Sequence, residues 1–537
     1  LTVLDEQGDS VPARISITDS KGKFYAPPYA WIAADDGYDR RERRFEAHYF
    51  DLPESHPEDD WLPPAETRRR SRASRRSSEL EVSVPAGPIK IEVMKGFAYR
   101  PQTETVILGP GKNESVSIRL ERLDWKSPRN AQWVSGDLHV HMNYGGVYRN
   151  GPRNLVEQAE AEDLGIVNDL IVNKEQRVPD IMYRGRQTDR NSDSDMLLIH
   201  GQEFHTSYWG HRGLLNIKEH ILLPGYAGYP NTAAASLYPM NADVYDMAHE
   251  LGALVGAVHP FDAIPDPFAK PAQTITDELP IDVALGKLDY LEVVGFSDHR
   301  STAAVWYRLL NLGFRIPAGG GTDAMANFAS LRGPVGMNRV FARVPGGILD
   351  ANAWLGALKR GQTFATNGPL LEFSLGTQQI GDELTFAQPQ TAVAFTAKLR
   401  SIVPVDHLEV VCNGKVAQTL KLDKARTSGD VEGTLPVSES GWCVLRASSD
   451  QAEYPVLDNY VYATTSPIYF TVGGNAPRAP EDAKYFAAWI DRVREATAAY
   501  PDSNSAAEKA YVLGRLAEAK RVYERLEQQV IVADAGE

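Results

Sequence analysis

The sequence predicts a multidomain protein of mixed α/β and β class, in which an α/β domain lies between two β-sandwich-like domains and a helical hairpin follows. The chain has 537 residues, which is too many for one hydrophobic core. Apolar residues alternate at period two in the first and third parts. Apolar runs alternate with helical segments in the second part, and the tail has helical spacing. We expect domains at 1–126, 130–367, 368–474 and 478–532.

The N-terminal domain is predicted to be β because its apolar residues alternate strictly. Strands are expected at Val11–Ile17, Leu80–Val84 and Ile89–Val93. An insertion at Thr67–Ser78 is dense in arginine and serine. We favour a solvated surface loop facing an acidic body for this charged insertion, and the alternative is a docking site for an anionic surface.

The second domain is predicted to contain a parallel sheet or barrel, because strand-like runs alternate with helical segments. The expected strands are Ile166–Val172, Met196–Ile199, Leu254–Val258, Leu288–Val294 and Arg315–Ala318, and the expected helices are Leu155–Leu164, Asn241–Leu251, Ser301–Leu312 and Ala351–Arg360. Active sites in such folds lie at the carboxyl ends of the strands, so polar clusters should be sought there.

The third domain is predicted to be a second β-sandwich, with strands at Ala392–Lys398, Leu408–Cys412, Trp442–Ala447 and Ile468–Val472. Two helices, at 481–499 and 503–529, should form the hairpin of the tail. The only two cysteines, Cys412 and Cys443, lie in strand-like runs. They either form a disulfide across the sandwich, which would suit an exported protein, or are two small buried residues without a covalent link.

Composition limits the class of protein. Charged residues make up 24% and hydrophobic residues 43%, as in ordinary globular proteins. No apolar run approaches the roughly 20 residues of a membrane helix, so no transmembrane segment is expected. The net charge of −15 argues against nonspecific nucleic-acid binding. The printed sequence starts at Leu1 and shows no targeting signal, but we expect export to the periplasm or the extracellular space.

Candidate metal ligands follow several predicted strands. His139 and His141 lie one residue apart after an apolar-flanked run, so in a strand they point to the same face. Glu203, His259 and Asp323 follow three later strands. Imidazole and carboxylate together suit hard-to-intermediate metals. A carboxylate shared by two metals lets a bridging water ionise near neutral pH, so these residues predict a metalloenzyme.

These residues resemble the motifs of the PHP superfamily, the polymerase-and-histidinol-phosphatase metal-dependent hydrolases. Over longer stretches around these motifs, the sequence is most similar to the carbaryl-hydrolase-like branch of this superfamily. The resemblance covers about 230 residues and implies a distorted (β/α)7 barrel. The matching segments are 136–141 (GDLHVH), 201–203 (GQE), 210–215 (GHRGLL), 259–260 (HP) and 322–323 (TD), and for the branch 139–146, 319–327 and 361–369.

The resemblance implies a role for each matched residue. His139 and His141 would bind a first metal, whose shell Asp323 would close. Glu203 would bridge two metals, and His211 and His259 would hold the second, although His205 lies close enough in sequence to replace His211. The residues expected to hold a third metal are missing, because Val147, Asn173-Lys174 and Met325 stand in their places. We therefore expect one or two divalent ions, with zinc, manganese and iron all acceptable.

The predicted function is a divalent-metal-dependent hydrolase that cleaves an ester-type bond of a small molecule with a metal-activated water. The branch implies carbamate or carboxylic esters, and the wider superfamily implies phosphoesters. Lys174, Tyr144 and His299 are candidate catalytic residues for protonating the leaving group, and Lys174 stands where relatives hold another cation. The alternative is a catalytically weak or inactive PHP-like surface-binding protein that uses its β-domains to recognise a polymer or partner. Oligomeric state cannot be read from the sequence.

Overall fold

The structure is a computed structural model. It describes residues 1–27, 33–35, 48–52, 80–125, 130–144, 150–172, 180–183, 185, 188–206, 208–221, 228, 235–327 and 333–534, with the backbone alone at 33–35, 48–52 and 529–534. The charged insertion at Thr67–Ser78 and the candidate residue Lys174 lie outside the described residues.

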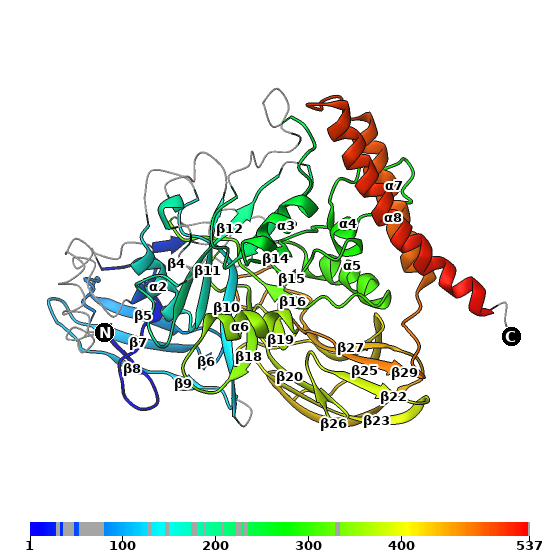
Figure 1. Ribbon diagram of the computed structural model, residues 1–537. Coiled ribbons are helices and arrows are strands. Elements are labelled where there is room, and N and C mark those ends of the chain that lie inside the picture. The colour runs from blue at the N-terminus through cyan, green and yellow to red at the C-terminus, as the bar shows by residue number, and fades with distance from the viewer. Residues whose placement is uncertain are drawn as a thin grey trace.

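The described chain has mixed α/β architecture built on large sheets (Figure 1). The N-terminal part forms a five-stranded sheet in the order β3-β4-β2-β5-β7, and two further pairs of short strands. The strands are β1 (Thr2–Leu4), β2 (Ala13–Asp19), β3 (Ala33–Asp35), β4 (His48–Leu52), β5 (Gly87–Met94), β6 (Tyr99–Arg100), β7 (Gln102–Leu108), β8 (Ser117–Arg119) and β9 (Glu121–Arg122). The prediction of a strand at Leu80–Val84 is wrong: Leu80 is buried and donates its N–H to Leu1, but no ladder follows.

The middle part carries the strands that position the candidate site. They are β10 (Ala131–His141), β11 (Ile166–Val172), β12 (Leu197–Phe204), β13 (Arg212–Leu215), β14 (Leu254–Ala257), β15 (Tyr290–Val294), β16 (Ala318–Gly320) and β17 (Ala324–Met325). The helices are α2 (Pro152–Ala161), α3 (Asn241–Glu250), α4 (Leu279–Ala284), α5 (His299–Asn311) and α6 (Ala351–Lys359).

Strand pairing runs in chain order from β10 to β16, and β17, three residues after β16, pairs with β10. The order therefore returns to the strand on which it began. Most of these pairs are parallel, as expected, but β13 is antiparallel to both of its neighbours. The sequence did not indicate β13, because the four residues Arg212–Leu215 are too short a run to show a period.

The C-terminal β-region continues the same sheet. β18 (Arg339–Pro345) pairs with β10, and the order then passes through β19 (Thr363–Thr366), β28 (Tyr462–Thr465), β27 (Gly441–Ser448), β24 (His407–Cys412) and β25 (Lys415–Thr419). β29 (Ile468–Val472) pairs with β27 and with β22 (Glu383–Phe386). A separate sheet contains β21 (Gln378–Gln379), β20 (Leu370–Leu375), β23 (Gln390–Arg400) and β26 (Ser428–Val437).

Cys412 and Cys443 form a disulfide. The two cysteines are register partners on the antiparallel strands β24 and β27, which are neighbours in one sheet. The expected bridge across a sandwich is therefore a cross-strand bridge within one sheet. Export of the protein stays a prediction.

The tail is a helical hairpin of α7 (Pro480–Ala499) and α8 (Ala506–Asp534), which lies along α4 and α5 in Figure 1. Phe486, Ile490 and Val493 are buried, as their spacing predicted. Tyr523 Oη donates to the Pro280 carbonyl at 2.7 Å, and Trp489 Nε1 donates to the Asp277 carbonyl at 3.1 Å. The hairpin is thus fixed to the middle part by apolar packing and by hydrogen bonds.

The hydrophobic cores cross the expected boundaries. One core contains residues of the N-terminal strands, such as Ile15 and Val93, together with residues of the C-terminal β-region, such as Leu371 and Leu445. The division into four domains stays a prediction. Of the helices in the described residues, none is long and apolar enough to cross a bilayer.

Candidate metal centre

The first two candidate ligands lie at the carboxyl end of β10. His139 and His141 point to the same face, with side-chain exposures of 0% and 2%. Their Nε2 atoms are 3.1 Å apart. The residues that alternate with them along the strand, Leu138 and Val140, are fully buried in apolar clusters. The alternation of a strand therefore fixes both imidazoles over one point.

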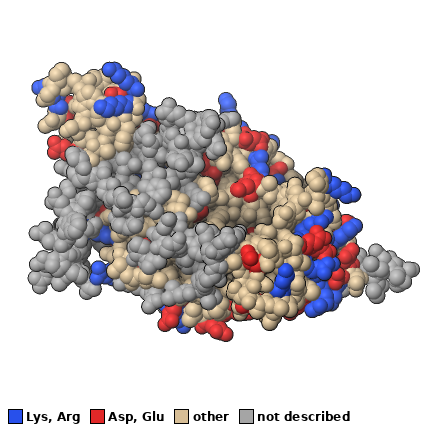
Figure 2. Space-filling model, turned by 90° about the horizontal axis from the view of Figure 1, so that it is seen from above, with Lys and Arg blue, Asp and Glu red and all other residues tan. Residues whose placement is uncertain are grey.

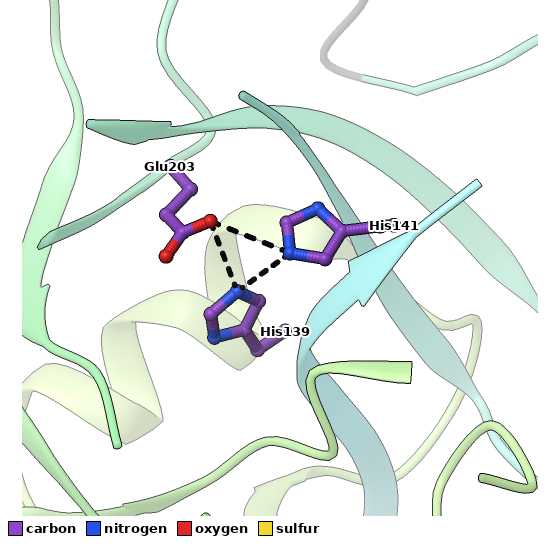
Figure 3. Close-up of side chains that lie close together, drawn as sticks. All are labelled: His139, His141 and Glu203. Atoms are coloured by element: carbon purple, nitrogen blue, oxygen red, sulfur yellow. Dashed lines mark hydrogen bonds and ion pairs between the residues drawn. The ribbon is translucent and has the colours of Figure 1, made fainter. Parts of the chain in front are cut away.

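Glu203, at the end of β12, faces this pair. Its Oε2 lies 3.7 Å from His139 Nε2 and 3.4 Å from His141 Nε2. Figure 3 shows the three side chains converging from two strands on a common centre. β11 pairs with both β10 and β12 in parallel, which brings the two strand ends to the same edge.

Asp323 reaches the same centre from the loop after β16. Its Oδ1 is 2.9 Å from His141 Nε2, and its N–H donates to the His139 carbonyl at 2.7 Å. Gly321 permits this approach, because a Cβ there would lie 2.6 Å from both Glu292 Oε1 and His139 Cβ. Asp323 has φ of 56°, a left-handed conformation of the kind that is held at functional sites when the surroundings enforce it.

His211 and His259 complete the group from another direction. His211 Nδ1 is 2.9 Å and His259 Nε2 is 3.4 Å from Glu203 Oε1, and His259 Nε2 is 3.7 Å from Asp323 Oδ2. Their side chains are 24% and 16% exposed. We call His139 and His141 the inner pair, and His211 and His259 the outer pair.

Both carboxylates stand between the two pairs. Glu203 turns Oε2 to the inner pair and Oε1 to the outer pair. Asp323 turns Oδ1 to the inner pair and Oδ2 to His259. Two carboxylates that each present one oxygen to each side form an arrangement able to hold two adjacent cations.

The charged groups of this cluster counteract the effect of burial on one another's pKa values. Burial lowers the pKa of His139, but the facing carboxylates of Asp323 and Glu292 outweigh it and hold that pKa well above its ordinary value. The same opposition raises the pKa of His141. Burial raises the pKa of Glu203, yet the facing imidazoles bring it well below the usual range. The site therefore favours positive charge, which protons or a cation can supply.

The residues fit a divalent cation. Glu203 Oε1 is buried and has no hydrogen bond within the described residues, since His211 Nδ1 approaches it outside hydrogen-bonding geometry. Three groups have ligand atoms within 4.8 Å of one another: His139, His141 and Glu203; His139, His259 and Asp323; and Glu203, His205 and His211. Nitrogen and carboxylate donors in this mixture suit zinc, manganese or iron.

Two groups hold the inner pair from behind. The His141 Nδ1 atom lies 2.7 Å from the Leu170 carbonyl, so Nδ1 carries the proton and the Nε2 lone pair faces the centre. Glu292, for which the sequence predicted no role, is fully buried on β15 with Oε1 3.4 Å from His139 Nδ1. Its Oε2 accepts the His259 N–H at 3.0 Å. A carboxylate in the middle of an apolar strand was the signal that could have found it.

Asp137 is also buried and fixes the loop that carries Asp323. It accepts hydrogen bonds from the Thr322 hydroxyl at 2.6 Å, and from the N–H groups of Thr322, His139 and Gly336. Burial raises the pKa of Asp137 to about 6 despite these donors. Its bonds tie β10 to the loop after β16, so the two sources of inner ligands move together.

Arg212 plays the corresponding part for the outer pair. It is fully buried, pairs with Asp282 at 3.0 Å, and donates to the His211 carbonyl at 2.9 Å and to the Trp209 carbonyl at 3.1 Å. Arg212 was not among the predicted site residues, because its partner is 70 positions away along the chain.

A second buried group lies behind β10. His200 on β12 lies between Asp169 Oδ2, at 2.8 Å, and Asp189 Oδ2, at 3.2 Å. The other oxygen of Asp169 accepts the Met142 N–H at 2.9 Å, one residue after the inner pair. Burial lowers the pKa of His200, but the two carboxylates outweigh it and raise the pKa to about 9.

The candidate catalytic residues are placed differently from one another. The Tyr144 ring centroid lies 5.2 Å from that of His141. His299, at the start of α5, is buried with Nε2 3.0 Å from Asp458 Oδ2 and near Asn367, so its contacts connect it to the C-terminal β-region. Lys174 lies outside the described residues.

Comparisons with known proteins give weak likenesses. No family model matches the chain, and no curated protein sequence matches it. A two-domain protein from Bacteroides vulgatus ATCC 8482, described as containing a predicted PHP-like metal-dependent phosphoesterase, is 13% identical with a TM-score of 0.31, over 61% of this chain and 94% of that one. PsfC from Pseudomonas syringae PB-5123 is 16% identical with a TM-score of 0.29, over 43% and 90%. The lesion-specific endonuclease Q of Pyrococcus furiosus is 16% identical with a TM-score of 0.27, over 42% and 56%. At these scores the likenesses establish neither fold nor activity for this chain.

Proposed function

We propose that this chain is a divalent-metal-dependent hydrolase of the PHP superfamily that cleaves an ester-type bond of a small molecule. In this proposal β10 to β17 form the distorted (β/α)7 barrel of that superfamily, flanked by two β-sandwich domains. The six side chains His139, His141, Glu203, His211, His259 and Asp323 are the metal ligands.

One observation carries the proposal. Glu203 turns one carboxylate oxygen to the inner pair and the other to the outer pair. Asp323 turns one oxygen to the inner pair and the other to His259. A bound divalent cation supplies a Lewis acid that polarises the scissile bond and lowers the pKa of water. A pair of shared carboxylates supports the expectation of one or two such ions.

The protein's own residues would then provide orientation. The Leu170 carbonyl keeps the His141 proton on Nδ1, and the Glu292 carboxylate lies 3.4 Å from His139 Nδ1 as a facing negative charge. Asp137 holds the loop of Asp323 at a fixed distance from β10. These supports let the ligands keep one arrangement before a substrate binds, and such preorganisation is a main source of rate enhancement.

The leaving group needs a proton, and Tyr144 is the described candidate nearest to the inner pair. In this proposal Lys174 stabilises the negative charge of the transition state, in the place where relatives hold a third cation, and His299 is a further candidate for donating the proton. Lys174→Met and Tyr144→Phe should each reduce turnover and leave metal content unchanged. Unchanged turnover in either variant removes that residue from the mechanism.

The substrate class is tested with the metal-reconstituted protein and a panel of aryl phosphate mono- and diesters, aryl carboxylic esters and aryl carbamates. We expect chelator-sensitive turnover of at least one class, with phosphoesters pointing to the wider superfamily and carbamates to the carbaryl-hydrolase-like branch. A DNA duplex with an abasic site is the expected negative in this panel, because the net charge of −15 predicts that nucleic acid is not a substrate. On the face seen in Figure 2, acidic and basic side chains are intermixed over the described residues.

Metal analysis separates this proposal from a binding protein that has lost activity. The hydrolase should hold at least one equivalent of divalent ion after reconstitution. Less than one equivalent, together with no turnover of any ester, would favour the surface-binding alternative, in which the β-domains recognise a polymer or partner.

A further inference from the structure

The hairpin of β12 and β13 places another histidine beside the outer pair. The antiparallel register pairs Gln202 with Leu214, Glu203 with Gly213, and Phe204 with Arg212. The next pair in this register is His205 opposite His211. Because side chains alternate along a strand, His205 shares the face of Glu203, two residues earlier.

The turn of the hairpin holds these two imidazoles together. The Thr206 hydroxyl donates to the Gly210 carbonyl at 3.0 Å and accepts the Trp209 N–H at 3.1 Å. The ring centroids of His205 and His211 are 3.3 Å apart. Ligand atoms of Glu203, His205 and His211 all lie within 4.8 Å of one another.

We propose that His205 is a metal ligand of the outer half of the centre, acting with His211 and Glu203. This inference rests on the proposed metal-dependent function. Glu203, His205 and His211 form a group of their own, in which all ligand atoms lie within 4.8 Å of one another, whereas His259 belongs to a different group, with His139 and Asp323. In this group His205 adds a third donor from the same hairpin that carries Glu203 and His211. Three protein donors and a water complete the four-coordinate shell that zinc accepts.

The position of His205 also predicts how the outer cation exchanges. His205, like His211, is partly exposed, whereas the inner pair is buried. A cation held by His205 and His211 therefore lies on the solvent side of Glu203, where it can leave without disturbing the inner ligands.

The test uses the full chain with cobalt(II) as a spectroscopic probe. Both native cysteines are joined in a disulfide, so His205→Cys introduces the only free thiol. If position 205 is a ligand, the cobalt-loaded variant shows an intense thiolate-to-cobalt absorption in the near ultraviolet that the parent protein lacks. His407→Cys is the matched control, because His407 is half-exposed and pairs only with Asp450 among the contacts that the structure describes. It should show no such absorption.

His205→Ala provides a second measurement. We expect it to retain the inner cation and to bind the outer one more than 10-fold more weakly than the parent protein, measured by competition with a chromophoric chelator. Equal affinities in parent and variant, or a His205→Cys spectrum without the thiolate band, would overturn the inference alone. A parent protein that binds no metal would instead overturn the proposed function. A midpoint of thermal unfolding equal to that of the parent protein shows that each variant is folded.

Discussion

The inner and outer halves of the candidate centre use the same kinds of donor but differ in depth. His139 and His141 are 0% and 2% exposed, whereas His211 and His259 are 24% and 16% exposed. In the inner half a carbonyl orients His141, and a buried carboxylate faces His139 Nδ1. In the outer half, Arg212 donates a hydrogen bond to the backbone carbonyl of His211, so the described contact fixes the backbone of His211 and not its ring. If the proposed function holds, the buried half retains an ion and the half that solvent reaches meets the substrate.

The strongest test of this comparison is His139→Ala. His139 belongs to two of the three groups of ligand atoms, one with His141 and Glu203 and one with His259 and Asp323. Its loss also takes one facing imidazole from Glu203 and Asp323 and the facing imidazole of His139 from Glu292. We expect metal content to fall below one equivalent and hydrolysis to fall to background, measured by elemental analysis and turnover. Activity that survives in this variant would sink the assignment of the centre.

His211→Ala should separate the halves. Because His211 faces Glu203 Oε1 and not the inner pair, the variant should retain one ion and lose the other. Affinity for the lost ion should fall by more than roughly 100-fold, because loss of a residue that only hydrogen-bonds to a metal ligand can already cost that much. Turnover should fall with it, and His407→Ala is the control. Loss of both ions in this variant would show that the two halves cannot bind independently.

The group behind the inner pair predicts a pH dependence of stability. His200 has a pKa of about 9 when folded against 6.5 ordinarily, so its stabilisation is complete below pH 6.5 and is lost as pH rises through 9. The shift corresponds to roughly 3 kcal/mol. Burial raises the pKa of Asp189 but the His200 hydrogen bond lowers it to about 2, so its share is lost only in acid, from about pH 4 downward.

The measurement is thermal unfolding of the parent protein and of His200→Asn between pH 6 and 9. The parent should lose stability relative to the variant across this range, since Asn carries no charge to lose. Parallel curves would contradict a charged His200 between Asp169 and Asp189.

The positions of the candidate ligands could be predicted because they follow strand ends. His139, His141, Glu203, His259 and Asp323 lie at or just after β10, β12, β14 and β16, where the parallel-sheet rule directed the search. The structure brings these residues together with His211, and their role as ligands stays a prediction.

What the sequence could not predict depends on partners far along the chain. Glu292 lies inside the apolar strand β15, and its contacts with His139 and His259 exist only once three strands are aligned. His299 pairs with Asp458, which is 159 residues away. The facing of His205 and His211 required the antiparallel register of β13, which four residues cannot reveal by their period.

Glu292→Gln is the finest test, because Glu292 touches both halves. Its Oε1 faces His139 Nδ1 and its Oε2 accepts the His259 N–H, and an amide has only one oxygen to serve both. We expect metal affinity to fall about 10- to 100-fold, with the fold intact, in competition with a chromophoric chelator. Glu409→Gln, at a mostly buried carboxylate paired with Arg446, is the control and should bind as the parent does. If only the outer ion is weakened, Glu292 acts through the His259 backbone; if only the inner ion is weakened, it acts through the His139 ring. Unchanged affinity for both ions would show that depth of burial, and not this carboxylate, distinguishes the halves.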